Sequence, residues 1–390
     1  MLESAEDSRF SARRPVREGN RVEVLVDGEE ALPAMSATIA GARSHVHIAG
    51  WHSSPEFRLT REPGAPTLRE LLGETAERVP VRLLLWAGPP VPAFQHPADR
   101  SIGWHDMTMR VEGPIVADVA EHFRRCWTEV AEESLPEPKV QDPAGTSNVQ
   151  FVRTVPEKTH AFAPRGEFTI VDTYLRALRS AKRLVYLENQ FLWSPEVAEI
   201  LIGKLKNPPA DDFRVVLVLP RKPSNGADTT RGQLGRLLDA DDDGRRLLAT
   251  TLTSHDGDNE TPVYVHAKLG IVDDEWMTVG SANLNEHSLF NDSEANLVTD
   301  DVELIRDTRL KLWAEHLQRS KSEVDGDPAK VVDELWRPIA EKDRPNRLTL
   351  LPSVSRRAAG YRARCADCSS TADQAGSPAS RRCAERNRCW

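Results

Sequence analysis

Two short apolar segments lie close together in the second half of the chain: Val263-Tyr-Val-His-Ala-Lys-Leu-Gly-Ile-Val-Asp273 and Trp276-Met-Thr-Val-Gly-Ser-Ala-Asn283. Their polar residues follow the pattern H-x-K-x4-D-x6-G-S-x-N. Apolar runs of this length predict two strands, and the acidic stretch between them predicts a turn. Because side chains two residues apart on a strand point to the same face, we expect His266 and Lys268 to lie side by side.

This hairpin predicts a site for phosphoryl chemistry. Its return strand would bring Ser281 and Asn283 back towards His266 and Lys268. An imidazole can act as nucleophile or general acid. An ammonium group neutralises the oxygens of a phosphate, and hydroxyl and amide groups donate hydrogen bonds to them. No His, Cys or carboxylate cluster occurs at metal-ligand spacing, so we expect no metal and no cofactor.

An internal repeat surrounds this hairpin. Ala42–Trp51 and Ala181–Gln190 each combine a basic helix end with an apolar strand, at an offset of 139 residues. Asp106–Trp127 and Asp292–Trp313 each begin with Asp, continue through a short strand and end in an amphipathic helix, at an offset of 186. The copies therefore agree at both ends, and the first lacks roughly 50 residues in its middle.

The missing part of the first copy lies between Trp86 and Asp106, where its own hairpin motif is expected. Of the eleven histidines in the chain, only His266 is followed by lysine two residues later. The sequence therefore predicts a first lobe that has lost core strands together with one catalytic histidine.

The motif resembles the HKD signature of the phospholipase D superfamily. Tyr186–Phe191 also resembles the segment before that family's second motif, and Trp104–Asp106 and Arg110–Pro114 resemble the end of its first half. The resemblance implies an α/β fold of two repeated lobes, each a mixed β-sheet flanked by helices. The active site would lie at the seam between the lobes, and the first lobe would be truncated.

The resemblance also implies roles for individual residues. One histidine attacks phosphorus to form a phosphohistidine, and the histidine of the other lobe protonates the leaving alcohol. Water then completes hydrolysis, or a second alcohol completes transfer. Carried over to this sequence, the catalytic residues are His266, Lys268 and Asp273, the last in a supporting structural role; the phosphate-binding residues are Lys268, Ser281 and Asn283; and the residue that orients His266 is Asp292 or Glu294. Asp106, the counterpart of Asp292, would have no histidine to orient.

The expected domain order is an N-terminal extension (1–20), a truncated first lobe (21–134), a linker (135–150), a second lobe (151–355) and a tail (356–390). The tail has no Leu, Ile, Val, Met or Phe, so we expect it to be disordered. Four of the five cysteines lie there, and they can be interpreted as free thiols or, at an atypical spacing, as a zinc site.

Charge limits the classes of partner. The whole chain carries −9, and the tail has eight Arg against three acidic residues, which leaves −14 on residues 1–355. Such a body is a poor match for nucleic acid. Because no apolar run reaches the ~18 residues that span a bilayer, and residues 1–20 are charged throughout, we expect a cytoplasmic protein with peripheral contact at the membrane.

The resulting hypothesis is a phospholipase D-like phosphodiesterase or phosphatidyltransferase that acts on phospholipid head groups. Because a monomer carries one motif, a homodimer is one way to complete its active site. The alternatives are a degenerate phosphate- or lipid-binding relative and a nuclease-type phosphodiesterase. Lys222–Leu234 is expected at the rim of the site. The tryptophans of the repeats are expected in the core, with a lipid groove as the alternative: Trp51, Trp86, Trp104, Trp127 and Trp313.

Overall fold

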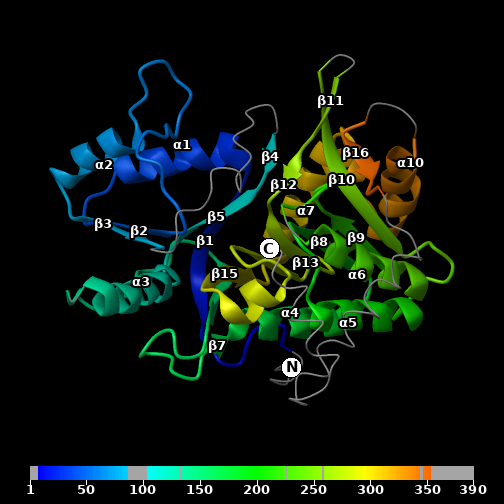
Figure 1. Ribbon diagram of the computed structural model, residues 1–390, viewed down its shortest axis with the longest axis horizontal. Helices are drawn as coiled ribbons and strands as arrows, with labels where there is room; N and C mark the ends of the chain where they lie inside the picture. The colour runs from blue at the N-terminus through cyan, green and yellow to red at the C-terminus, as the bar shows by residue number, and fades with distance from the viewer. Residues whose placement is uncertain are drawn as a thin grey trace, which may run out of the picture.

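The computed structural model describes residues 8–86, 103–131, 133–224, 226–256, 259–342 and 346–352 (Figure 1). The tail predicted for 356–390, with its alternative zinc site, lies outside these ranges. None of the helices described is both long and apolar enough to cross a membrane.

A mixed sheet of twelve strands joins both halves of the chain (Figure 1). Its order is β11-β10-β9-β8-β13-β14-β15-β6-β1-β5, with β16 beside β10 and β7 beside β6. The strands are β1 (Val16–Val26), β5 (Met107–Glu112), β6 (Ser147–Val155), β7 (Glu167–Phe168), β8 (Leu184–Asn189), β9 (Arg214–Val218), β10 (Leu247–Asp256), β11 (Asn259–Pro262), β13 (Lys268–Val272), β14 (Trp276–Gly280), β15 (Glu294–Thr299) and β16 (Leu348–Leu350).

Two smaller sheets each consist of one parallel pair. One joins β2 (Val46–Gly50) to β3 (Val81–Leu85), and the other joins β4 (Trp104–His105) to β12 (Tyr264–Val265). The α-helices are α1 (Asp27–Ala40), α2 (Leu68–Ala76), α3 (Val116–Ala131), α4 (Thr169–Ser180), α5 (Pro195–Lys206), α6 (Ala227–Ala240), α7 (Val302–Leu317), α8 (Lys321–Val324), α9 (Pro328–Val331) and α10 (Arg337–Ala340); π-helical turns span His287–Asn291 and Val332–Trp336.

The second lobe is a sheet between two hydrophobic cores. On β9, Val215 and Leu217 pack into the core that contains helices α4, α5 and α6, whereas Val216 and Val218 pack into the core beneath α7. This alternation follows from the two-residue period of a strand, and it explains why a strand buried on both faces is a continuous apolar run. The predicted α/β class, a large mixed sheet flanked by helices, is therefore confirmed.

The internal repeat is visible in the topology. The pairs β2–β3 and β8–β9 are both parallel, and α3 and α7 keep the offset of 186 residues along their whole lengths. The copies meet where β1 lies antiparallel to β6. Both of these strands begin a few residues earlier than the predicted lobe boundaries at 21 and 151.

The truncation separates the first lobe into two parts. In the second lobe, β13 and β14 lie between β8 and β15, but in the described part of the first lobe no strand joins β2 to β5. Among the described residues, the β2–β3 pair therefore lacks the neighbouring strands that β8 has in the second lobe. Trp51 and Trp86, which follow these strands, are 46% and 53% exposed, so the prediction that they pack in the core is wrong. Trp313, by contrast, is fully buried.

Candidate active site

The predicted hairpin is present. Strands β13 and β14 pair antiparallel, with Leu269 opposite Val279. Asp273 and Asp274 both have positive φ, at 56° and 54°, which suits the tight turns that favour Asp. The hairpin ends at Gly280, where an added Cβ would lie 2.4 Å from the carbonyl oxygen of Ala295, so only glycine fits.

His266 and Lys268 do not share one continuous strand. The backbone N–H groups of His266 and Ala267 both donate to the carbonyl oxygen of His105, at 2.8 and 3.1 Å. Because of these two hydrogen bonds to the first lobe, β12 and β13 are separate strands. The expectation of a simple same-face pair is therefore corrected: Lys268 is folded back so that its Nζ donates to the carbonyl oxygen of His266.

The carboxylate that holds His266 comes from the first lobe. Nδ1 of His266 lies 2.7 Å from Oδ2 of Asp106. We expected Asp292 or Glu294 to orient this imidazole, and we expected Asp106 to have no histidine; both expectations are wrong. The reason is the pairing of β4 with β12, which aligns the segment ending at Asp106 with the strand that precedes His266.

This contact determines which nitrogen of His266 is available. When Nδ1–H donates to Asp106, Nε2 is left for a reacting atom. Burial favours the protonated form of Asp106, but the hydrogen bond from His266 and the positive charge of Lys268 outweigh it and lower the pKa of the carboxyl. Asp106 therefore stays ionised as the partner of His266.

The two carboxylates expected beside His266 lie elsewhere. Asp292 is exposed, and its backbone N–H donates to the carbonyl oxygen of His287 at 2.7 Å. Glu294 accepts hydrogen bonds from the hydroxyls of Ser281 and Ser288. Burial, reinforced by the charge of Asp292, raises the pKa of Glu294 to about 7. Ser281 thus has its hydroxyl committed to Glu294.

Lys268 is a buried cation between two acidic side chains. Its side chain is nearly inaccessible to solvent, and burial lowers its pKa to about 8, although the charges of Asp106 and Glu294 act in the opposite direction. An ammonium in such a place has lost most of its hydration, so it interacts strongly with any phosphate that approaches. It loses its charge as the pH rises through about 8.

Asn283 has a side chain with unused hydrogen-bonding capacity. Its Oδ1 is buried and has no partner among the described residues. The oxygen and nitrogen of an amide are exchanged by a simple flip, so either atom can face a ligand. Of the predicted phosphate-binding residues, Asn283 is the one with an unpaired buried atom.

Aromatic side chains that the motif did not predict border His266. The ring of Trp104 lies 5.0 Å from the His266 ring and 5.2 Å from that of Tyr264. The hydroxyl of Tyr264 accepts hydrogen bonds from Nε2 of Gln190, at 2.7 Å, and from the backbone N–H of Ser224, at 3.1 Å. The last contact brings part of the predicted Lys222–Leu234 rim beside the site.

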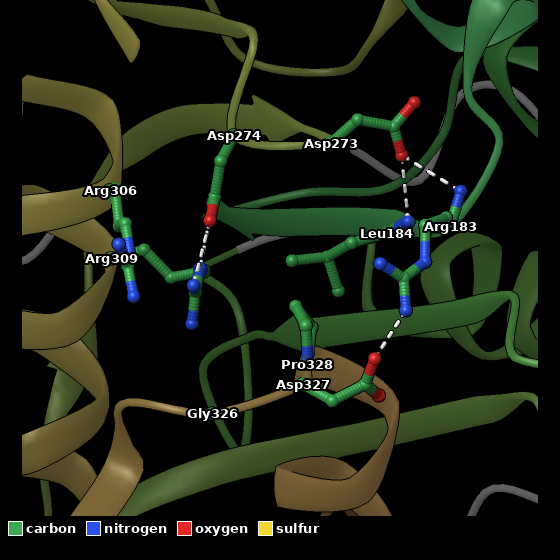
Figure 2. Close-up of a pocket in the computed structure, with 9 residues that line it drawn as sticks. All are labelled: Arg183, Leu184, Asp273, Asp274, Arg306, Arg309, Gly326, Asp327 and Pro328. Carbon is green, nitrogen blue, oxygen red and sulfur yellow. Dashed lines mark hydrogen bonds and ion pairs between the residues drawn. The ribbon is translucent and has the colours of Figure 1, made fainter. Parts of the chain in front are cut away.

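Asp273 lies at the other end of β13 from His266. Its carboxylate accepts hydrogen bonds from the backbone N–H groups of Lys182, Arg183 and Leu184, each at 2.8 Å. Figure 2 shows it beside Asp274 at a pocket of about 260 Å³, with Arg183 and Arg309 also on the wall. Asp273 therefore fastens the start of β8 to the hairpin and does not reach the reacting groups.

Part of the chain matches a known protein family. The family described as "Cardiolipin synthase, PLD-like domain" matches residues 174–314, which contain the hairpin, Asp273 and α7 up to its last turn. Residues 174–314 therefore match the phospholipase D superfamily. Relatives of the chain include Phospholipase D A of Dictyostelium discoideum, 27% identical over 283 residues, and Phospholipase D alpha 1 of Arabidopsis thaliana, 24% identical over 324 residues.

The chain spans less than half the length of those relatives. The two alignments cover 57% and 55% of this chain but 22% and 40% of the respective relatives. Among solved structures, a phosphatidylserine synthase of Haemophilus influenzae aligns with 83% of this chain and 95% of its own, at 10% identity and a TM-score of 0.49. The family match and the phospholipase D relatives support a phosphodiesterase-type function at the level of the superfamily.

Proposed function

We propose that this protein is a phosphodiesterase of the phospholipase D superfamily that cleaves or exchanges phospholipid head groups. The observation that carries the proposal is the 2.7 Å contact between His266 and Asp106, with buried Lys268 beside it. The names of its relatives, which are phospholipases D, support the lipid substrate. The net charge of −14 on residues 1–355 disfavours a nuclease.

The reaction proposed has two steps. Nε2 of His266 bonds to phosphorus while the bond from phosphorus to the head-group oxygen breaks, and the departing oxygen takes a proton. Water or a second alcohol then displaces the histidine. Lys268 neutralises the non-bridging oxygens, and Asn283 donates a hydrogen bond to one of them.

The departing head-group oxygen needs a proton donor, and the single HKD motif supplies one histidine, which already acts as the nucleophile. Within one chain no second motif histidine exists, so we propose that a homodimer supplies the second imidazole. The carboxylate for His266 already comes from the same chain, so a partner would have to contribute a histidine alone. The same observation favours the rival function, a degenerate relative that binds phosphate or lipid without turnover.

An assay over protein concentration tests these proposals together. Vesicles of phosphatidylcholine or phosphatidylglycerol should release head group, with a specific activity that rises with protein concentration and levels off as the dimer forms. A DNA oligonucleotide should stay intact. Constant activity per chain would exclude the dimer, cleavage of DNA alone would favour the nuclease, and vesicle binding without any product would favour the degenerate relative.

Peripheral membrane contact is proposed for the end of the β2–β3 pair. Trp51 and Trp86 are exposed there, and their rings lie 6.2 Å apart. Trp51 is the repeat counterpart of Gln190, which borders the site of His266 through Tyr264. Aromatic rings of this kind favour the interface between water and lipid.

Replacing both tryptophans by serine should weaken vesicle binding about tenfold or more, because each ring loses more than 1 kcal/mol of apolar burial in the interface. Sedimentation of the protein with phosphatidylglycerol vesicles measures this. The matched control replaces Val130 and Val140, which are exposed elsewhere, by serine and should leave binding unchanged. Equal binding by both double variants would refute contact through this edge.

A further inference from the structure

A second cluster of titratable side chains is buried behind the candidate active site. His105, Glu188 and His316 are all completely inaccessible to solvent. Nε2 of His105 lies 2.7 Å from one oxygen of Glu188, and Nε2 of His316 lies 3.0 Å from the other. The hydroxyl of Tyr186 donates to the same carboxylate. Glu188 thus accepts three hydrogen bonds and stays ionised at full burial.

Asp27 extends this cluster to the surface of the first lobe. Its Oδ1 lies 2.9 Å from Nδ1 of His105 and accepts the backbone N–H of Asp106, also at 2.9 Å. The backbone N–H of Asp27 donates in return to the carbonyl oxygen of Asp106, at 2.8 Å. Asp27 has φ of 58°, a strained conformation for a residue with a Cβ that persists where its surroundings enforce it.

Both imidazoles lie at hydrogen-bond distance from Glu188, whereas Asp27 makes an ion-pair contact with Nδ1 of His105 that is not aligned as a hydrogen bond. An ion such as zinc, held at about 2.0–2.1 Å by each ligand, would separate its ligand atoms by roughly 3.3 Å. The contacts from His105 and His316 to Glu188 are shorter than that, and they engage different oxygens. Burial alone would lower the pKa of His105, but the carboxylates of Glu188 and Asp27 raise it to about 10. A charged imidazolium between two carboxylates accounts for the arrangement.

We propose that Asp27, His105 and Glu188 form a seam relay that positions Asp106 against His266. His105 is the residue before Asp106, and its carbonyl oxygen accepts the backbone N–H groups of His266 and Ala267. A shift of His105 would therefore move both partners of the catalytic contact. Glu188 anchors the relay in the second lobe, and Asp27 anchors it in the first.

Asp27 is thus a positioning residue. The effect of its replacement on turnover rests on the proposed function. The charged groups around His266 are Asp106, Lys268 and, through Lys268, Glu294. Those around His105 are Asp27, Glu188, His316 and, near Asp27, Glu315. Asp27 thus acts on His266 through Asp106.

A double-mutant cycle on the full-length chain tests this path. Asp27→Asn keeps an acceptor for the Asp106 amide and tolerates positive φ, but it removes the charge that holds His105. We expect kcat to fall about tenfold with little change in KM, and Asp106→Asn to cost about 10²-fold. In the Asp106→Asn background the Asp27 substitution should have almost no further effect on kcat, because the carboxylate through which Asp27 acts on His266 is already absent.

A second readout does not need activity. The ring chemical shifts of His266, followed by NMR of histidine-labelled protein, should change in Asp27→Asn, and that change should disappear in the Asp106→Asn background, since Asp27 acts on His266 through Asp106. If wild type turned over no lipid while this coupling persisted, the proposed function would fail and the relay would stand.

The matched control is Asp274→Asn, because Asp274 also has positive φ and is ion-paired, in its case with buried Arg309. It should lower stability without coupling to Asp106. Two results would overturn the relay: additive effects of the Asp27 and Asp106 substitutions on both readouts, or stoichiometric binding of Zn²⁺ by wild type in equilibrium dialysis that Asp27→Asn abolishes.

Discussion

Replacing His266 by alanine is expected to lower phospholipid turnover by about 10³-fold or more, because it removes the one imidazole of the HKD motif in this chain. Asp106 would remain in place as a carboxylate without a partner, and Lys268 would still attract phosphate. Substrate binding should therefore survive while the chemical step is lost. In kinetic terms, kcat should fall much further than KM changes.

The decisive measurement is capture of the covalent intermediate. Wild type quenched in denaturant during turnover should carry a peptide in which His266 is bonded to the phosphorus of the phosphatidyl group, detected by mass spectrometry, and the variant should carry none. His45→Ala, at an exposed histidine of the first lobe, serves as control and should behave like wild type. Equal turnover by His266→Ala and wild type would dismiss the enzymatic proposal.

Asp273→Ala is expected to have the largest effect on stability. It removes the acceptor for three backbone N–H groups at the start of β8, and Asp273 is itself nearly buried. Hydrogen bonds to a charged acceptor are worth ~1.5–3 kcal/mol each, so a loss of about 3–5 kcal/mol is expected after partial replacement by water. Urea unfolding followed by circular dichroism measures it.

Two further variants separate this role from catalysis. Asp273→Asn keeps one acceptor oxygen and the turn conformation, so it should lose about half as much. Glu74→Ala, at an exposed helical position, should stay within about 0.5 kcal/mol of wild type. A stable Asp273→Ala protein that has lost all activity would instead make Asp273 part of the reacting machinery.

Much of the fold was accessible from local patterns. The hairpin follows from two apolar runs around Asp273 and Asp274, and the repeat follows from the constant spacing of Asp106–Trp127 and Asp292–Trp313. Even the truncation could be located, since the offset between the copies changes between Trp86 and Asp106. These features depend on residues close together in the sequence, and the spacing of apolar residues predicts such local structure.

The partner of His266 was predicted incorrectly because it depends on a contact between residues 160 apart. Strands β4 and β12 have two residues each, too few to give a hydrophobic pattern. The order of the sequence favoured carboxylates that follow the hairpin, such as Asp292. The one available signal was the Trp-His-Asp triplet ending at Asp106. Since the first copy has no motif histidine, this carboxylate had no expected partner within its own lobe.

The exposed tryptophans were missed for a related reason. A tryptophan at the end of a strand is buried when neighbouring strands cover it. We predicted burial of Trp51 on the assumption of such a complete sheet. The composition of the segment around a tryptophan does not show whether a neighbouring strand is present to cover its ring. The loss of core strands was deduced from the spacing, but its effect on the surface around Trp86 was not.

The strand order also bears on how such a chain can persist through evolution. The first copy has kept β1 and β5, the pair that adjoins the second copy, and the short β4 that delivers Asp106. The strands that it lacks correspond to β13 and β14 of the second copy, which lie between β8 and β15. The first copy thus holds Asp106 against His266, and selection that maintains this contact would also maintain the strands that position Asp106.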